Sequence, residues 1–109
     1  MTNDFEKKAF DMLSGMGADL DALACDDDPE KLYEYLDECL DVEFRCNSAK
    51  EYKSAKLYVT LGGPNVWVDT RNGEVAGAWG CDRESAWLAS EVCEEIDEIF
   101  REWFACLRA

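Results

Sequence analysis

The chain has 109 residues, 48% of them hydrophobic, and its 25 Asp and Glu against 11 Lys and Arg give a formal net charge of −14. This length fits one domain with a modest core, and the hydrophobic content argues against a disordered acidic chain. The charge argues against direct binding to nucleic-acid phosphates or anionic membranes, because like charges repel. A basic protein surface is therefore the expected partner.

The N-terminal residues, MTNDFEKKAFDML, contain no apolar run of signal-peptide length. No stretch of about 18 consecutive apolar residues, the length needed to span a bilayer, occurs anywhere in the chain. These two observations predict a cytoplasmic location and no membrane contact.

The first part of the chain reads as helical. Apolar residues at helical spacing predict a helix over residues 4–16, which Gly15 and Gly17 weaken at its end, and a short turn is expected over residues 19–23. A second helix is expected to start with Asp28 as cap and Pro29 at its first position, and to run to about Leu40. Its expected apolar stripe consists of Leu32, Leu36, Cys39 and Leu40.

Residues 57–80 alternate between apolar and other side chains and predict three antiparallel strands. Turns are expected at residues 62–65 and at residues 71–73, where Asn72-Gly73 is the signal of a tight hairpin. Leu57, Val59 and Leu61 are expected to point toward the helices. Residues 42–46 also alternate and predict a further strand, at an edge or inside the sheet, whereas the polar residues 47–54 predict a loop.

From Asp82 onward the pattern changes and predicts a single long helix with Asp82 as its cap. Trp87 and Phe104 widen its apolar stripe, which consists of Leu88, Val92, Ile96, Ile99, Phe100, Trp103 and Leu107. The predicted fold is therefore α+β, with N-terminal helices, a central antiparallel meander of three to four strands, and a long C-terminal amphipathic helix packed on the sheet.

The six cysteines stand in no CxxC spacing and the chain has no histidine, which argues against a zinc site. Cys39 and Cys46 follow apolar patterns, so buried reduced thiols are expected. The run Asp26-Asp27-Asp28 lacks the spacing, the glycine and the final glutamate of a calcium loop. No metal or other cofactor is predicted.

Acidic residues are concentrated at both ends of the chain: residues 1–43 carry 14 acidic and 3 basic residues, and residues 84–109 carry 7 and 2. Like charges three to four residues apart destabilise a helix. Such rows indicate either a solvated face or a surface that binds cations. One row contains Glu30, Glu34, Asp37, Glu38 and Asp41, and the other contains Glu91, Glu94, Glu95, Asp97, Glu98 and Glu102.

The outer face of the meander is a second candidate surface. If Leu57, Val59 and Leu61 face the helices, then Tyr58, Thr60, Trp67 and Asp69 face away from them. An exposed Trp and Tyr are typical interface anchors. Alternatively, a cross-strand Tyr58–Trp67 pair supports the sheet or is covered by the first helix.

Catalysis has little support in the sequence. Without histidine, a nucleophile and base would need a Cys–Asp or Ser–Lys arrangement that no motif signals, and GGPN lacks the lysine and spacing of a phosphate-binding loop. Carboxylates are so frequent on the predicted helix faces that their pairing indicates no general acid and base. The chain is predicted not to be an enzyme.

The segment GGPNVWVDTRNGEVAGAWG, followed by an acidic helix of the type DEIFREWF, resembles small acidic proteins carried by bacteriophages and mobile elements. The resemblance covers roughly residues 57–104. In size and acidity the chain is also similar to anti-CRISPR proteins, some of which imitate the phosphate rows of DNA. The resemblance implies an inhibitor of a host defence protein, and it assigns no functional residue.

These observations predict an acidic inhibitor that occupies the nucleic-acid-binding surface of a host defence protein, of CRISPR type, by presenting carboxylates in place of phosphates. An immunity or adaptor protein that binds a basic partner through the sheet face is the alternative, and a thiol or metal regulator is a third. Acid on one continuous side favours mimicry, and dispersed acid favours the adaptor. The expected partner-binding residues are Glu34, Asp37, Glu38, Asp41, Glu94, Glu95, Glu98, Glu102, Tyr58 and Trp67.

Overall fold

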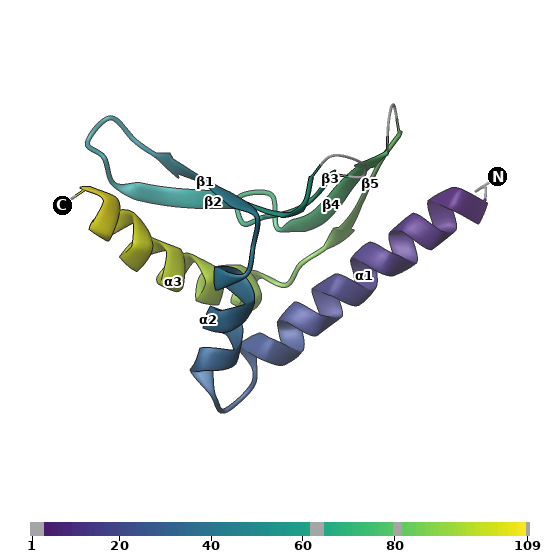
Figure 1. Cartoon of the computed structure of the whole chain (residues 1–109), viewed down its shortest axis with the longest axis horizontal. Helices are drawn as coiled ribbons and strands as arrows, with labels where there is room; N and C mark the ends of the chain where they lie inside the picture. The colour runs from purple at the N-terminus through teal and green to yellow at the C-terminus, as the bar shows by residue number, and fades with distance from the viewer. Residues whose placement is uncertain (1–3, 62–64, 80–81, 109) are drawn as a thin grey trace.

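The computed structural model describes residues 4–61, 65–79 and 82–108, and the side chains of residues 7–61, 65–79 and 82–107. The chain forms three helices and five strands in these ranges (Figure 1). None of these helices is long and apolar enough to cross a membrane. The elements in chain order are α1 (Asp4–Ala24), α2 (Pro29–Asp37), β1 (Asp41–Cys46), β2 (Tyr52–Thr60), β3 (Asn65–Asp69), β4 (Glu74–Trp79), β5 (Asp82–Trp87) and α3 (Ser90–Arg108).

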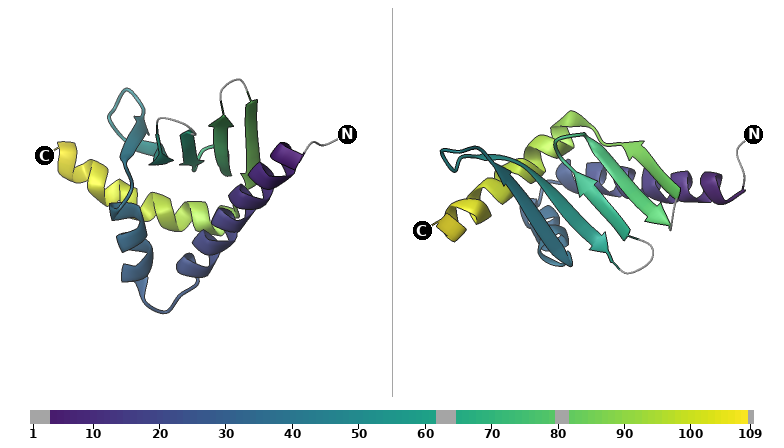
Figure 2. Two further views of the ribbon diagram at one scale, coloured as in Figure 1. Left: turned by 45° about the vertical axis from the view of Figure 1, so that its right-hand side comes forward. Right: turned by 90° about the horizontal axis from the view of Figure 1, so that it is seen from above.

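The five strands form one antiparallel meander in the order β1-β2-β3-β4-β5. The helices all lie on one side of this sheet: α1 packs under β4 and β5, α3 packs under β2, and α2 lies against α1 (Figure 2). In the described ranges no helix covers the other face of the sheet. The α+β class and the packing of the C-terminal helix on the sheet are confirmed, and the sheet has five strands where three to four were predicted.

One row of paired side chains crosses the whole sheet on the helix side. It consists of Val42, Leu57, Val68, Val75 and Ala86, each directly opposite the next. The helices add further buried side chains to this core, among them two fully buried ones from α1 and two from α3, and burying each such side chain contributes about 1.5–3 kcal/mol. These four residues are Leu13, Leu20, Ile96 and Phe100.

Helix α1 is a single helix of 21 residues, so the predicted break after Met16 is wrong. Gly17 lies buried inside it, and a Cβ atom there would be 3.5 Å from the carbonyl oxygen of Trp87 and 3.9 Å from Val75. The absence of a side chain therefore lets α1 approach the sheet closely. This contact offsets the cost of about 1 kcal/mol that glycine brings to a helix interior.

The start of α2 agrees with the prediction, and its end does not. Asp28 is the cap, its carboxylate accepts from the backbone N–H of Glu30, and Pro29 follows at the first position. The helix ends at Asp37 because the chain already joins the sheet: the Leu40 N–H donates to the carbonyl of Tyr58 at 3.0 Å. Leu40 is accordingly 60% exposed and is not part of the apolar stripe.

Strand β2 begins at Tyr52, earlier than predicted, so the connection after β1 is shorter than residues 47–54. Asn47 closes the turn, because its side-chain oxygen accepts from the N–H groups of Ala49 and Glu51. At the other end of β2 a register irregularity lies between Tyr58 and Thr60. Beyond it Leu61 is half exposed, so the prediction that Leu61 points toward the helices is wrong.

The largest error concerns the segment that begins at Asp82. Residues Asp82–Trp87 form β5, paired with β4, and α3 starts only at Ser90. Asp82, Arg83 and Glu84 are typical of a helix start, yet they form the first half of an edge strand whose buried residue is Ala86. Trp87 is 89% exposed and Leu107 is 71% exposed, so neither belongs to a buried stripe. The predicted turn at residues 62–65 falls largely outside the described residues. The second predicted turn is present as a four-residue loop, residues 70–73, between the paired Asp69 and Glu74, and Gly73 adopts φ +63 at its end.

We expect Ile96→Ala to lower the free energy of unfolding by about 2–5 kcal/mol, because Ile96 is fully buried in the core cluster. Leu107→Ala on the same helix is the matched control and should cost less than about 0.5 kcal/mol, since its side chain is exposed. Urea unfolding followed by circular dichroism measures both. Equal costs for the two variants would contradict the packing of α3 on the sheet.

A candidate protein-binding groove between two acidic helices

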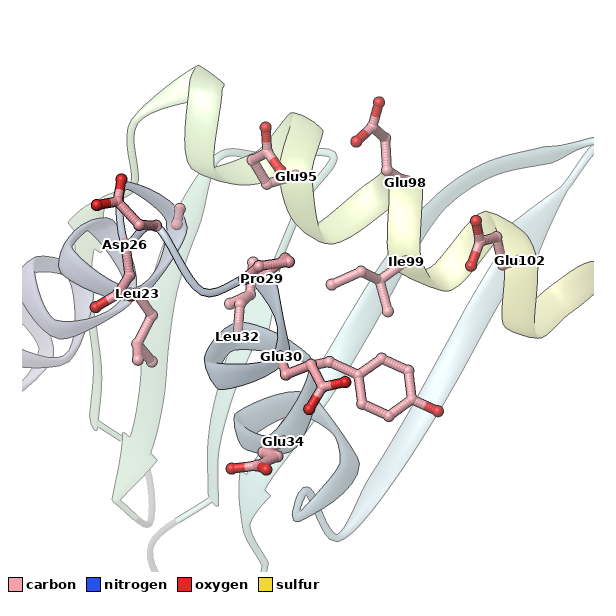
Figure 3. Close-up of a pocket in the computed structure, with 13 residues that line it drawn as sticks. Leu23, Asp26, Pro29, Glu30, Leu32, Glu34, Glu95, Glu98, Ile99 and Glu102 are labelled. Carbon is pink, nitrogen blue, oxygen red and sulfur yellow. The ribbon is translucent and has the colours of Figure 1, made fainter.

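A groove of about 740 Å³ lies between α2, the loop before it, and α3. The two helices meet at the edge-to-face contact of the Tyr33 and Trp103 rings, whose centroids are 5.4 Å apart. Apolar side chains line part of the groove, and Ile99 points from α3 into the space between the helices (Figure 3). Its acidic lining, here called the groove carboxylates, is Asp26, Asp27, Glu30, Glu34, Glu95, Glu98 and Glu102.

Helical periodicity explains why these acids gather. On α3, Ile96 and Phe100 are buried against the sheet, which turns Glu95, Glu98 and Glu102 to the flank of the helix. On α2, the inward-facing leucines likewise leave the glutamates at its start beside the groove. Each helix thus contributes one side of the same surface.

Few cations neutralise the groove carboxylates. Lys31 forms an ion pair with Asp26 at 3.1 Å, but no other groove carboxylate has an ion-pair partner in the part of the chain that the structure describes. The pKa of Asp26 is lowered by the N–H of Asp28 and then by Lys31. An apolar surface framed by unpaired carboxylates attracts and holds basic side chains.

The structure divides the eight predicted acidic site residues into two sets. Glu34, Glu95, Glu98 and Glu102 line the groove. The other four, here called the off-groove carboxylates, are Asp37, Glu38, Asp41 and Glu94, and all four are exposed.

Two off-groove residues have local structural roles instead. Glu38 caps the end of α2, and the Asp41 carboxylate accepts from the N–H of Val42. Asp97, placed with the outer row of α3 from the sequence, accepts a 2.5 Å hydrogen bond from the Tyr52 hydroxyl. Burial, followed by this bond, raises the pKa of Tyr52.

Sequence reasoning did not assign Asp26, Asp27 and Glu30 to the binding site. The pattern of the run Asp26-Asp27-Asp28 indicates a helix start, and Asp28 does cap α2. The loop before α2 brings its acids beside α3, about 70 residues away in the sequence. No local pattern encodes that proximity.

Tyr58 and Trp67 are a directly opposed cross-strand pair on the face of the sheet without helices. Lys56 places its ammonium 4.5 Å from the centroid of the Trp67 ring and 5.1 Å from that of Tyr58, and Arg83 lies 5.7 Å from Trp67. Both aromatics are half-buried. The pair therefore supports the sheet and interacts with cations of its own chain, whether or not a partner also uses it.

Asp69 lies on this face, but the expectation that it points into solvent is wrong, because it is only 3% exposed. Its two oxygens accept from the guanidinium of Arg45 at 3.0 and 2.9 Å, and its Oδ1 also accepts from the N–H groups of Arg71 and Asn72. Burial by itself would raise the pKa of Asp69, but these donors outweigh it and hold that pKa below its ordinary value. Asp69 thus ties β3 to β1 and to the following turn.

The cysteines differ from the prediction at Cys46. The five that the structure describes are free thiols: Cys25, Cys46 and Cys106 are exposed, Cys39 is half-buried and Cys93 is buried, while Cys81 lies outside the described residues. Cys46 is exposed because the register shifts between Arg45 and Cys46, at the end of β1. In the described ranges no three cysteine or carboxylate side chains form a cluster that could hold a metal ion.

We expect native-state thiol labelling to modify Cys25, Cys46 and Cys106 quickly and Cys93 only after unfolding. Burial, followed by the charge of Asp97, raises the pKa of Cys93 to about 11, so little thiolate forms at neutral pH. Peptide mass spectrometry after timed alkylation measures each site. Native labelling of Cys93 as fast as that of Cys25 would contradict this assignment.

The groove between α2 and α3 and the aromatic face of the sheet are thus the two candidate surfaces of the described chain, and they lie on opposite sides of the sheet. The first is acidic and hollow, whereas the second is aromatic and already in contact with cations. Comparisons with protein-family models, with curated proteins and with solved structures find no match.

Proposed function

We propose that this protein is an inhibitor that binds a basic segment of a nucleic-acid-binding protein in the groove between α2 and α3. The groove carboxylates take the places of phosphates and neutralise the Lys and Arg side chains that would contact nucleic acid. The observation that carries this proposal is the convergence of seven carboxylates from two helices and a loop around an apolar surface. The resemblance to phage-borne acidic proteins suggests a host defence protein of CRISPR type as the target.

The shape of the groove favours a protruding segment over a flat surface. Carboxylates stand on both sides, and Leu23, Leu32 and Ile99 supply apolar contact between them. A segment with Lys or Arg on its flanks and an apolar side chain between them would meet both kinds of surface. Arginine suits this setting because its planar guanidinium binds a carboxylate through two parallel hydrogen bonds.

The distribution of charge also supports rapid association. Among the described residues only Asp26 of the seven groove carboxylates has an ion-pair partner, so the potential over the groove is strongly negative. Such a field raises the association rate with a basic partner, and the gain falls as salt screens it. Apolar contacts in the groove maintain the part of the affinity that salt does not remove.

The adaptor hypothesis remains the second candidate because of Trp87, whose indole is 89% exposed on the edge strand β5. Trp87 lies opposite Glu74 on the face that also carries Trp67. Exposed tryptophans are frequent interface anchors. Against this candidate, Lys56 and Arg83 already cover Trp67.

Two charge-reversal variants of equal net charge, one inside the groove and one outside it, test the proposal. A groove variant replaces Glu34, Glu95, Glu98 and Glu102 with lysine, and a control variant replaces the off-groove carboxylates with lysine. Each set of four reversals changes the charge by eight, from −14 to −6. We expect a basic partner captured from a host lysate to bind wild type and control, to be lost from the groove variant, and to be displaced from wild type by duplex DNA.

The controls separate the alternatives. Circular dichroism verifies that both variants are folded, as expected from their exposed positions. Equal loss in both variants would mean that only net charge matters, which contradicts a specific groove. Retention by the groove variant, with loss on Trp67→Ala or Trp87→Ala, would replace the proposal with the adaptor hypothesis.

A further inference from the structure

A second pocket, of about 390 Å³, lies at the end of the sheet where β1, β2 and the turn after β3 meet. Its lining is opposite in character to the acidic groove. It consists of Arg45, Cys46, Lys53, Ser54, Thr70 and Arg71, with three cations and no carboxylate. In a chain with a net charge of −14, this concentration of positive charge is the feature that the proposed function leaves unexplained.

Arg45 is held in a fixed position in this pocket. Its NH1 group donates to the Ser54 hydroxyl at 3.1 Å and to Asp69 at 3.0 Å, and its NH2 group donates to Asp69 at 2.9 Å. A guanidinium carries five N–H donors, so two of them remain for a ligand. The side chain is one-third exposed, which keeps it accessible.

Asp69, the carboxylate bonded to Arg45, does not neutralise Lys53 and Arg71. Both oxygens of Asp69 are occupied by the guanidinium of Arg45 and by donors of the turn that follows. Lys53 and Arg71 are exposed, and neither has a carboxylate partner within ion-pair distance among the described residues. The backbone of Arg71 is held beside the pocket, because its N–H donates to Asp69 at 2.9 Å.

The pocket also contains a neutral donor. Ser54 is only 5% exposed, and its hydroxyl oxygen accepts from Arg45. A hydroxyl has one proton to donate, and the described residues offer no acceptor bonded to it. The Thr70 hydroxyl, by contrast, is bonded to the N–H and carbonyl of Ala55 and is already satisfied.

We propose that this pocket binds a phosphate group, either as free phosphate or as a phosphate monoester. Arg45 and Ser54 supply fixed hydrogen-bond donors, and Lys53 and Arg71 supply the remaining positive charge. A phosphate dianion accepts several charge-assisted hydrogen bonds at once, which matches this set of donors. The site lies on the sheet and shares no residue with the groove, so it stands independently of the proposed function.

A titration of the ¹⁵N-labelled protein with sodium phosphate, against sodium chloride at equal ionic strength, tests the proposal. We expect saturable amide shifts at Arg45, Ser54 and Arg71 with phosphate alone. Lys53→Ala with Arg71→Ala should weaken binding about tenfold or more, since each removes a charge-assisted contact. Lys8→Ala, an exposed cation on α1, is the matched control and should change binding less than about twofold.

A second titration uses adenosine monophosphate to separate the two sources of the phosphate group. Tighter binding of the nucleotide, with the same dependence on Lys53 and Arg71, would assign the site to a phosphate ester. Equal or weaker binding would assign it to free phosphate. Failure of both ligands to shift these amides, or equal binding by the double variant and wild type, would overturn the proposal.

Discussion

The burial of the row Val42, Leu57, Val68, Val75 and Ala86 under α1 and α3 is the interaction on which the rest of the structure depends. Two helices cover one face of the sheet, and their apolar stripes determine how each helix is rotated. This rotation leaves Glu95, Glu98 and Glu102 on the flank of α3 that lines the groove with α2. The groove is thus a consequence of core packing and needs no dedicated interaction to form.

The same constraint separates charges of opposite sign. Acids gather on the helix side, where exposed carboxylates line the groove. Arg45 of β1 and Lys56 of β2 lie on the open face of the sheet, where Arg45 neutralises the buried Asp69 and Lys56 covers aromatic rings. One small chain therefore presents an acidic groove on one side and a basic pocket on the other, and each surface attracts a different class of ligand.

Local patterns predicted the elements that depend on neighbours in sequence. Asp28 and Pro29 start α2, and Asn72-Gly73 closes a hairpin, because caps and tight turns are set by backbone geometry within a few residues. The segment Asp82–Trp87 was misread because edge strands carry charged residues as helix starts do. Only its pairing with β4 shows that it is a strand.

The sequence by itself determined the α+β class, the inward face of α3 and the excess of acid, since composition and periodicity are local properties. It could not assign Asp26 and Glu30 to one surface with Glu98, or unite Arg45, Lys53 and Arg71 in a pocket. These groups come from segments far apart in the chain. Only the docking of helices on the sheet and the register of its strands bring them together, because proximity in three dimensions is a property of packing.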